Sequence, residues 1–263
     1  MEIVKKDIDG GKAFDWGRTS AVYAKYRDIY PHDIYEQLVK LGIGVKGQKA
    51  LDLGTGTGVI PRNMYHYGAE WTGVDISENQ IAQAKLLAEN NNMDITFLAS
   101  PAEDVEMPQG GFDVITACQC FWYFDYSTLI PKLYEMLKND GKLAVIQMGW
   151  LPDEDRIAGL SEKLVLEYNP DWTGAGWTRQ PVYIADEVLK YFEVEERVGF
   201  DINVPFTRES WNGRMKSCRG IGASLPDAEV SAWEREHIAM LTLTAPEEFE
   251  VLHYAAIAVL KKK

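Results

Sequence analysis

The feature that most constrains the fold of this chain is a short β-rich run that ends in three glycines at alternate positions. Residues 49–53 form the run, and Gly54, Gly56 and Gly58 follow it. Glycine lets a backbone turn tightly from a strand into a helix, and it lets a ligand approach the main chain closely. The next β-rich run ends in Asp75, where a carboxylate can accept hydrogen bonds from both hydroxyls of a ribose. These two features predict an α/β fold with a nucleoside site beyond the ends of its strands.

Strand and helix patterns alternate along most of the chain. Strands are expected at residues 49–53, 71–75, 94–99, 112–118, 142–148, 194–206 and 249–261. Ser77 is expected to cap the helix after the second strand, and Gln80, three residues later, to complete a capping box. Alternation of this kind predicts a Rossmann-like, doubly wound, mostly parallel seven-stranded sheet with helices on both faces and an inserted helical lid region.

The remaining helices divide the chain into four predicted regions. Helices are expected at residues 20–40 with a break at Pro31, at 162–168, at 207–220 and at 227–243, and a further helix is expected to end at Asn139-Asp140-Gly141. The regions are an N-terminal aromatic helical cap (1–45), the Rossmann-like core (46–150), an insertion or lid (151–192) and C-terminal strands and helices that complete the sheet (193–263). The third region is too long for an ordinary connection, and functional lids are a common reason for such length.

The charge of the chain argues against a nucleic-acid partner. Its 263 residues carry a formal net charge of −13, and the only purely basic run is residues 261–263. Binding to a phosphate backbone depends on clustered Lys and Arg, so the composition favours a small or neutral partner. Cys118, Cys120 and Cys218 are too few for a disulfide framework, and no metal-site spacing surrounds them. No signal peptide or membrane span is predicted, so a cytoplasmic location is expected.

The glycine spacing distinguishes this turn from the dinucleotide fingerprint. That fingerprint, Gly-x-Gly-x-x-Gly or Ala, would need a glycine or alanine at position 59 when it is counted from Gly54, and this chain has Val59. Here the glycines fall at every second residue, and an acidic residue, Asp52, precedes them. The pattern counts against a nicotinamide-dependent oxidoreductase but leaves it open.

Taken together, the motifs resemble those of the class I S-adenosylmethionine-dependent methyltransferases, in a small-molecule branch similar to methyltransferase type 11. The segments that carry the resemblance are residues 51–58, 74–77, 97–108, 111–114 and 138–145. It covers residues 20–150 closely and the rest of the chain in outline. The resemblance implies that S-adenosylmethionine (SAM) is the cofactor and that its methyl group passes to an acceptor.

The resemblance also implies roles for particular residues around the cofactor. The glycine loop would contact the methionine portion through its main chain, with Asp52 near the amino group, and Asp75 would hold the ribose. Many relatives carry an Asp just before the residue that matches Ala102, whereas this chain has Pro101, so Glu103 or the main chain would meet the adenine instead. The expected cofactor-binding residues are Tyr26, Arg27, Asp52, Gly54, Thr55, Gly56, Gly58, Asp75, Ile76, Gln80, Ala102, Glu103, Cys118 and Gln119.

Two aromatic segments favour a small-molecule acceptor. Residues 23–31 and 119–125 are similar to segments of small-molecule methyltransferases, including trans-aconitate-type enzymes, and Trp122 stands where those relatives often place His. The expected acceptor-binding residues are Tyr23, Trp122, Tyr123, Trp150 and Arg214. Packing in the hydrophobic core is an equally open interpretation for each aromatic residue.

The sequence assigns no catalytic residue. Of His32, His66, His237 and His253, only His32 lies beside the first aromatic segment. A hydroxyl or ammonium acceptor would have to lose a proton, whereas a carboxylate acceptor would not. We therefore expect a SAM-dependent methyltransferase that acts on a small molecule by in-line transfer. A non-enzymatic SAM-binding sensor and an NAD-dependent oxidoreductase stay open, and the sequence identifies neither the acceptor nor the oligomeric state.

Overall fold

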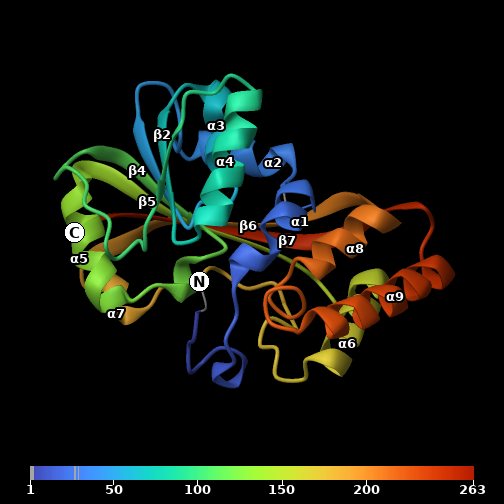
Figure 1. The fold of residues 1–263 in the computed structure, drawn as a ribbon. Helices are drawn as coiled ribbons and strands as arrows, with labels where there is room; N and C mark the ends of the chain where they lie inside the picture. Colours follow the sequence, from blue (N-terminus) through green and yellow to red (C-terminus); the bar gives the residue numbers. More distant parts are fainter. Residues whose placement is uncertain (1–2, 27, 29) are drawn as a thin grey trace. The chain divides into compact units, whose positions relative to one another are not determined.

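The computed structural model describes residues 3–26, 28 and 30–263, and its seven strands form one sheet in the order β3-β2-β1-β4-β5-β7-β6 (Figure 1). Strand β1 pairs in parallel with both β2 and β4, and the pairs β2–β3 and β4–β5 are also parallel. The strands are β1 (Lys49–Leu53), β2 (Glu70–Asp75), β3 (Thr96–Ala99), β4 (Phe112–Cys118), β5 (Leu137–Trp150), β6 (Phe192–Thr207) and β7 (Glu248–Lys262). The predicted seven-stranded, mostly parallel sheet is confirmed.

The order of the strands fixes where a ligand can bind. The chain runs outward from β1 through β2 to β3 and then returns to the other side of β1 with β4. In sheets of this kind the ligand crevice lies beyond the carboxyl ends of the strands, at the point where the order reverses. That point is the edge shared by the ends of β1 and β4.

The chain divides into two compact units, each made of three separate stretches. Unit 1 comprises Met1–Tyr30, Gly149–Arg179 and Asp201–Tyr254, and unit 2 comprises Pro31–Met148, Gln180–Phe200 and Ala255–Lys263. Strands β5, β6 and β7 each contribute residues to both units. No helix in the described ranges is long and apolar enough to cross a bilayer.

Unit 2 contains most of the sheet together with several helices. The helices are α2 (His32–Lys40), α3 (Val59–Met64), α4 (Glu78–Asn90), α5 (Tyr126–Met136) and α7 (Asp186–Leu189), with short 3₁₀ turns η3 (Tyr65–Tyr67) and η4 (Phe121–Tyr123). The apolar stripe predicted on α4 is buried, and its residues Ile81, Ala84 and Ala88 cluster with Phe97 of β3. This packing holds α4 against the sheet just beyond Asp75.

Of the two hydrogen bonds predicted for the capping box at Ser77, the structure confirms one and contradicts the other. Ser77 Oγ does accept a hydrogen bond from the Gln80 N–H (3.4 Å). The Ser77 N–H, however, donates to Asp75 Oδ1 (2.9 Å), and the buried Gln80 Oε1 has no hydrogen-bond partner among the residues described. A carboxylate two residues earlier in the chain is a stronger acceptor than the Gln80 amide, so it takes this N–H.

The predicted turn at residues 139–141 lies inside a strand. Helix α5 ends at Met136 and β5 begins at once, pairing Leu137 with Phe112. The register then shifts, so that Lys142 pairs with Val114. The Asn-Asp-Gly sequence therefore forms a bulge in β5 rather than the end of the helix, as expected where extra residues interrupt a ladder.

Unit 1 is mainly helical. Its helices are α1 (Ser20–Tyr26), α6 (Arg156–Tyr168), α8 (Arg208–Lys216) and α9 (Asp227–Thr244), preceded by 3₁₀ turns η1 (Asp9–Gly11) and η2 (Trp16–Thr19). Helix α6 begins six residues earlier than predicted because Asp155 Oδ1 caps the Ala158 N–H (2.9 Å). Thr207 and Ser210 form a capping box at the start of α8, which ends at Lys216, four residues before the predicted Gly220.

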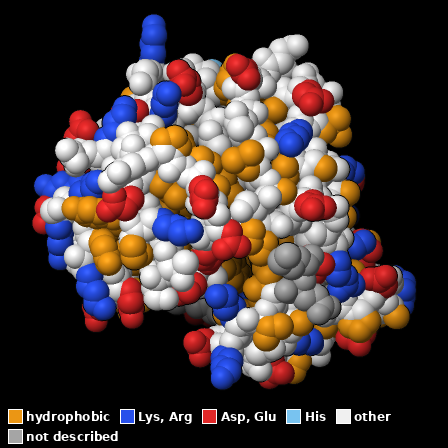
Figure 2. Space-filling model, turned by 60° about the vertical axis from the view of Figure 1, so that its left-hand side comes forward, with side chains coloured by type: hydrophobic (Ala, Val, Ile, Leu, Met, Phe, Trp, Pro, Cys, Tyr) orange, Lys and Arg blue, Asp and Glu red, His pale blue; other side chains and the backbone are white. Residues whose placement is uncertain are grey.

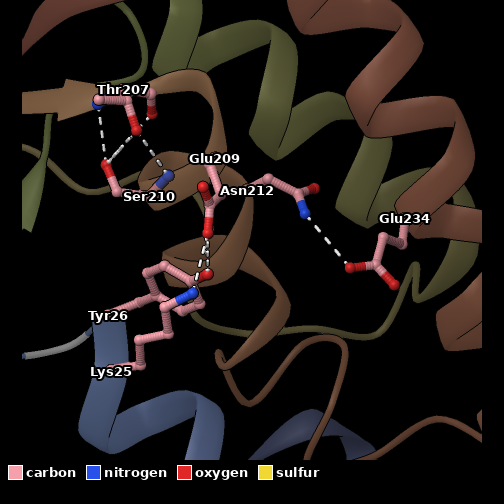
Figure 3. Close-up of polar contacts among 7 residues, drawn as sticks. All are labelled: Lys25, Tyr26, Thr207, Glu209, Ser210, Asn212 and Glu234. Atoms are coloured by element: carbon pink, nitrogen blue, oxygen red, sulfur yellow. Dashed lines mark hydrogen bonds and ion pairs between the residues drawn. The ribbon is translucent and has the colours of Figure 1, made fainter.

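Helix α1 docks on α8 through one aromatic residue (Figure 3). Tyr26 donates a hydrogen bond to Glu209 Oε1 (2.6 Å), which also accepts one from Lys25 Nζ (2.9 Å). The Tyr26 ring lies so close to Gly213 that a Cβ there would be 2.2 Å from its Cδ2. With α9, these two helices enclose a pocket of about 680 Å³ whose half-buried Lys216 and Glu234 pair at 2.6 Å.

Residues 169–177 are tied to the rest of unit 1 by several contacts. The Thr173 N–H donates to Asp9 Oδ1 (2.7 Å), and the Gly176 N–H donates to Glu162 Oε1 (2.8 Å). Trp177 packs directly on Gly149, where a Cβ would come within 2.6 Å of its ring. These contacts order much of the region that the sequence predicts as an insertion or lid.

Candidate functional site

The glycine loop follows β1 and is built entirely within unit 2. Gly54, Gly56 and Gly58 have φ values of 59°, 55° and 73°, in the left-handed region that glycine adopts at little cost. Space is also limited, because a Cβ on Gly54 would lie 2.7 Å from the Cys120 sulfur and one on Gly58 would lie 2.7 Å from the Phe97 ring. Both backbone conformation and packing therefore require glycine at Gly54 and Gly58.

Asp75 connects the end of β2 to this loop. Its Oδ2 accepts a hydrogen bond from the Gly56 N–H (2.9 Å), and its Oδ1 accepts the one from Ser77. Burial raises the pKa of the Asp75 carboxyl, and the two backbone hydrogen bonds oppose that rise. Each carboxylate oxygen has a second acceptor site, so Asp75 can still receive hydroxyl groups from a ligand.

Asp52 is a second carboxylate beneath the loop, and it is almost completely buried. Its Oδ1 accepts a hydrogen bond from Thr116 Oγ1 (2.6 Å) on the neighbouring strand β4. Burial raises the pKa of Asp52 to about 7 despite this hydrogen bond, and the charge of Asp75 raises it further. A cation placed beside Asp52 would favour its ionised form and so would be bound there.

The residues expected around an adenine lie beyond the ends of β2 and β3. Ala102 is buried and Ile76 is half-buried. Glu103 Oε1 accepts a hydrogen bond from the Asp125 N–H (2.8 Å), the residue that caps α5, and the Glu103 carbonyl accepts one from Lys132. Glu103 therefore already holds the start of α5, although its other carboxylate oxygen remains able to accept.

The end of β4 forms the floor of the loop. Gln119 has a φ of 61°, a conformation that is uncommon for a residue with a side chain, and its N–H donates to Ile146 O (2.9 Å). Its side-chain amide donates to Met148 O at the end of β5. This turn brings the Cys120 thiol to Leu53 O (3.0 Å), directly below Gly54. Half-buried Cys118 precedes the turn, and Trp122, 38% exposed, and Tyr123 follow it in η4.

Sequence reasoning missed Thr116 and Cys120, which support the two sides of the loop. Thr116 is a buried polar residue in β4, and the β1–β4 register places it opposite Asp52. Its polarity was visible in the sequence, but its partner follows only from the register. Cys120 is recognisable only from its packing on Gly54.

Comparison with known proteins identifies the domain that carries this loop. Residues 51–145 match a methyltransferase domain family, and this segment contains the glycine loop, Asp75 and Gln119. This match supports the predicted class I S-adenosylmethionine-dependent methyltransferase.

The chain is also similar to curated proteins that are named as methyltransferases. It is 25% identical over 189 residues to a ubiquinone biosynthesis O-methyltransferase of Glaesserella parasuis, covering 68% of this chain and 78% of that one. It is 32% identical over 112 residues to a demethylmenaquinone methyltransferase of Thermus thermophilus, covering 41% of this chain and 51% of that one. Its fold is similar to that of the YcgJ protein of Bacillus subtilis, with a TM-score of 0.53, 17% identity and coverage of 89% and 100%.

Several of the other predicted site residues belong to unit 1. Trp150 and Arg214 lie together there, with the guanidinium 5.0 Å from the centre of the Trp150 ring. Tyr23 packs edge-on against Trp16 at 6.3 Å, and Tyr26 bonds Glu209 as described above. Arg27 lies outside the described residues. The structure thus brings Trp150 and Arg214 together in unit 1 and the glycine loop, Asp52 and Asp75 together in unit 2.

Trp150 is part of an aromatic cluster that we define as Trp150, Phe206, Trp211 and His253. Trp150 lies 5.7 Å from Trp211, measured between ring centres, and its Nε1–H donates to the buried Glu162 (2.8 Å). Of the histidines, His32 is exposed and pairs with Glu36 (3.4 Å) on the surface of α2. Within the described ranges, no three His, Cys, Asp or Glu side chains are arranged to hold a metal ion.

Proposed function

We propose that the protein transfers the methyl group of SAM to a small-molecule acceptor. The observation that carries the proposal is the pairing of two carboxylates with a left-handed glycine loop: half-buried Asp75 accepts the Gly56 N–H at 2.9 Å, and buried Asp52 lies at the end of the strand that leads into the loop. The match of residues 51–145 to a methyltransferase domain supports this reading.

The residues of the loop fit the chemical groups of SAM. Asp75 has acceptor sites left for the ribose hydroxyls, and the buried Asp52 suits the ammonium of the methionine portion. Half-buried Ile76 and buried Ala102 offer an apolar surface for the adenine. We also assign to the cofactor Tyr26, Arg27, Thr55, Gln80, Glu103, Cys118 and Gln119. SAM itself supplies a methyl group on a positively charged sulfur. The protein would bind it, align the acceptor and exclude water, and a hydroxyl or ammonium acceptor would also have to give up a proton.

A small acceptor agrees with the surface and with the relatives. The net charge is −13, and on the face shown in Figure 2 basic side chains lie among acidic and apolar ones. Of the relatives given above, one is named for the biosynthesis of ubiquinone and one for demethylmenaquinone, and both compounds are small molecules. We assign acceptor contacts to Trp122 and Tyr123 in unit 2 and to Tyr23, Trp150 and Arg214 in unit 1.

Calorimetric titration with SAM, S-adenosylhomocysteine and NAD tests the proposal. We expect micromolar binding of the first two and at least a tenfold loss of affinity in Asp75→Ala, since the ribose would lose its acceptor. Asp125→Ala is the matched control, because that exposed carboxylate caps α5 and takes no part in the loop. Binding of NAD alone would overturn the proposal. SAM binding without methyl transfer to any small acceptor would instead indicate a sensor.

A further inference from the structure

Thr116 is a fully buried polar residue near the end of β4, and the proposed function gives it no role. The β1–β4 register pairs it with Asp52, and its Oγ1 donates a hydrogen bond to Asp52 Oδ1 at 2.6 Å. Both residues belong to unit 2. The hydroxyl of Thr116 therefore lies in the interior, beside the carboxylate that the proposed function assigns to the ammonium of SAM.

The length of this hydrogen bond indicates the charge state of Asp52. A hydroxyl has one hydrogen to donate, and a second acceptor, the Leu51 carbonyl oxygen, lies farther from Thr116 Oγ1 at 3.5 Å. The hydrogen therefore goes to Asp52. A hydroxyl that donates to an ionised carboxylate does so at about 2.5–2.7 Å, which is shorter than a bond between neutral groups. The distance of 2.6 Å is thus the geometry expected when Asp52 carries its charge.

The other surroundings of Asp52 oppose that charge. Burial raises the pKa of Asp52 to about 7, and the negative charge of Asp75 at the end of β2 raises it further. The Thr116 hydroxyl lowers this pKa, as does the nearby side chain of Thr55 in the glycine loop. The Cys120 thiol stays neutral, because burial raises its pKa well above the usual range. Among the described residues no Lys, Arg or His forms an ion pair with Asp52, so the Thr116 hydroxyl is the main protein group that favours the ionised form.

We propose that Thr116 is a positioning residue for the cofactor, whose hydroxyl holds Asp52 ionised and oriented so that the second carboxylate oxygen binds the ammonium of SAM. This inference rests on the proposed function and adds to it a residue that acts through Asp52 without touching the ligand. A protonated carboxyl would not attract the ammonium, so the bond between Thr116 and Asp52 also determines the pH range in which SAM binds well.

The sign of the expected pH effect follows from the direction of the change in pKa. Removal of the hydroxyl raises the pKa of Asp52 further, because a hydrogen bond to the charged form is lost. A larger share of the variant is then protonated near and below pH 7, where it binds the ammonium more weakly than the wild type does. At pH 9 the carboxyl is ionised in both proteins, and the difference in affinity disappears.

Substitutions at Thr116 separate its hydroxyl from its packing. Thr116→Val keeps the branched shape and removes the donor, whereas Thr116→Ser keeps the donor and removes a methyl group. Thr116→Ala removes the donor without placing a methyl group against the carboxylate, and it replaces Thr116→Val if that variant does not fold. Thr128→Val is the matched control, since it removes a hydroxyl that donates to the exposed Asp125 (2.8 Å).

The test is calorimetric titration of the whole chain with S-adenosylhomocysteine, which has the same amino-acid portion as SAM, at pH 6, 7, 8 and 9. The ratio of the variant Kd to the wild-type Kd is compared at each pH, so that titration of the ligand's own amino group cancels. For Thr116→Val we expect a ratio of about ten at pH 6 that falls close to one at pH 9, since a shift of one pKa unit changes the ionised fraction tenfold. Thr116→Ser and Thr128→Val should show no dependence of this ratio on pH.

Two results would overturn the inference. The first is a Thr116→Val or Thr116→Ala protein, folded as judged by thermal melting, whose Kd ratio is the same at every pH, because a purely structural role would change the affinity uniformly or not at all. The second is a Thr116→Ser protein with the pH-dependent ratio of Thr116→Val, which would exclude the hydroxyl as the group responsible. Failure of the wild type to bind at any of these pH values would instead refute the proposed function, on which the role of Thr116 rests.

Discussion

Unit 2 holds its polar site at the ends of adjacent parallel strands, whereas unit 1 holds its own inside a cluster of aromatic side chains. In unit 2 the carboxylates are satisfied by groups close by in the fold, as when Asp75 accepts the N–H groups of Gly56 and Ser77. In unit 1 the partners come from helices that pack without the regular register of a sheet, as with Trp211 of α8 and Ser161 of α6. The first kind of site follows from regular sheet geometry, and the second depends on how separate segments happen to pack.

The substitution with the largest expected effect tests whether sheet geometry alone determines the conformation of the glycine loop. Gly54→Ala keeps a left-handed φ of 59° and adds a Cβ 2.7 Å from the Cys120 sulfur, so the loop must move. Gly110→Ala has the same φ of 59° but meets nothing within 4 Å, and it serves as the control for backbone strain. We expect roughly a 100-fold loss of SAM affinity in the first and little change in the second, by calorimetry. Equal affinities would show that the loop tolerates displacement.

A second prediction concerns how the buried Asp52 lowers the free energy of unfolding as pH rises. Its folded-state pKa, about 7, lies above the ordinary value of 3.8, so the unfolded chain releases this proton at lower pH. The free energy of unfolding should therefore fall as pH rises between those values. The fall amounts to at most about 4 kcal/mol. Asp52→Asn should abolish it, as measured by urea unfolding at pH 4 to 8.

The same variant should bind SAM more weakly, because the ammonium would lose its carboxylate partner. Asp125→Asn gives the opposite control, since hydrogen bonds from Ser127 and Thr128 hold the pKa of that exposed carboxyl below its usual value. The contribution of the Asp125 carboxylate to the free energy of unfolding is present above its usual pKa and is lost as pH falls. An Asp52→Asn protein with the wild-type pH dependence would show that Asp52 is ionised throughout.

The sequence was informative where structure is local and uninformative where it is not. The seven strands, the glycine loop and the position of Asp75 follow from hydrophobic periodicity and turn residues. The capping box at Ser77 failed because a carboxylate two residues earlier competed for the same N–H. The pairing of Thr116 with Asp52 required the register of two strands. The surroundings of His253 required three segments to meet, which no local pattern specifies.

The smallest expected effect addresses the aromatic side of the comparison. Glu162 accepts hydrogen bonds from Trp150 Nε1 and from the Gly176 N–H, both at 2.8 Å. A glutamine can accept only one of them well, so Glu162→Gln should lower the free energy of unfolding by about 1–3 kcal/mol. SAM affinity should stay unchanged if the two sites are built independently. Glu167→Gln, on the exposed face of α6, is the control. A parallel loss of SAM affinity would show that the sites are coupled.

The path of the chain between the two units limits how such a protein can be altered. The chain changes unit five times, and three of these changes fall inside β5, β6 and β7. Any cut that removed unit 1 as a fragment would therefore sever strands of the sheet that also holds the glycine loop. Unit 1 therefore cannot be exchanged as a block, by recombination in nature or by domain swapping in the laboratory, without breaking strands of the sheet. Under the proposed assignment of acceptor contacts to unit 1, a new acceptor specificity requires single substitutions or replacement of the helices between β6 and β7.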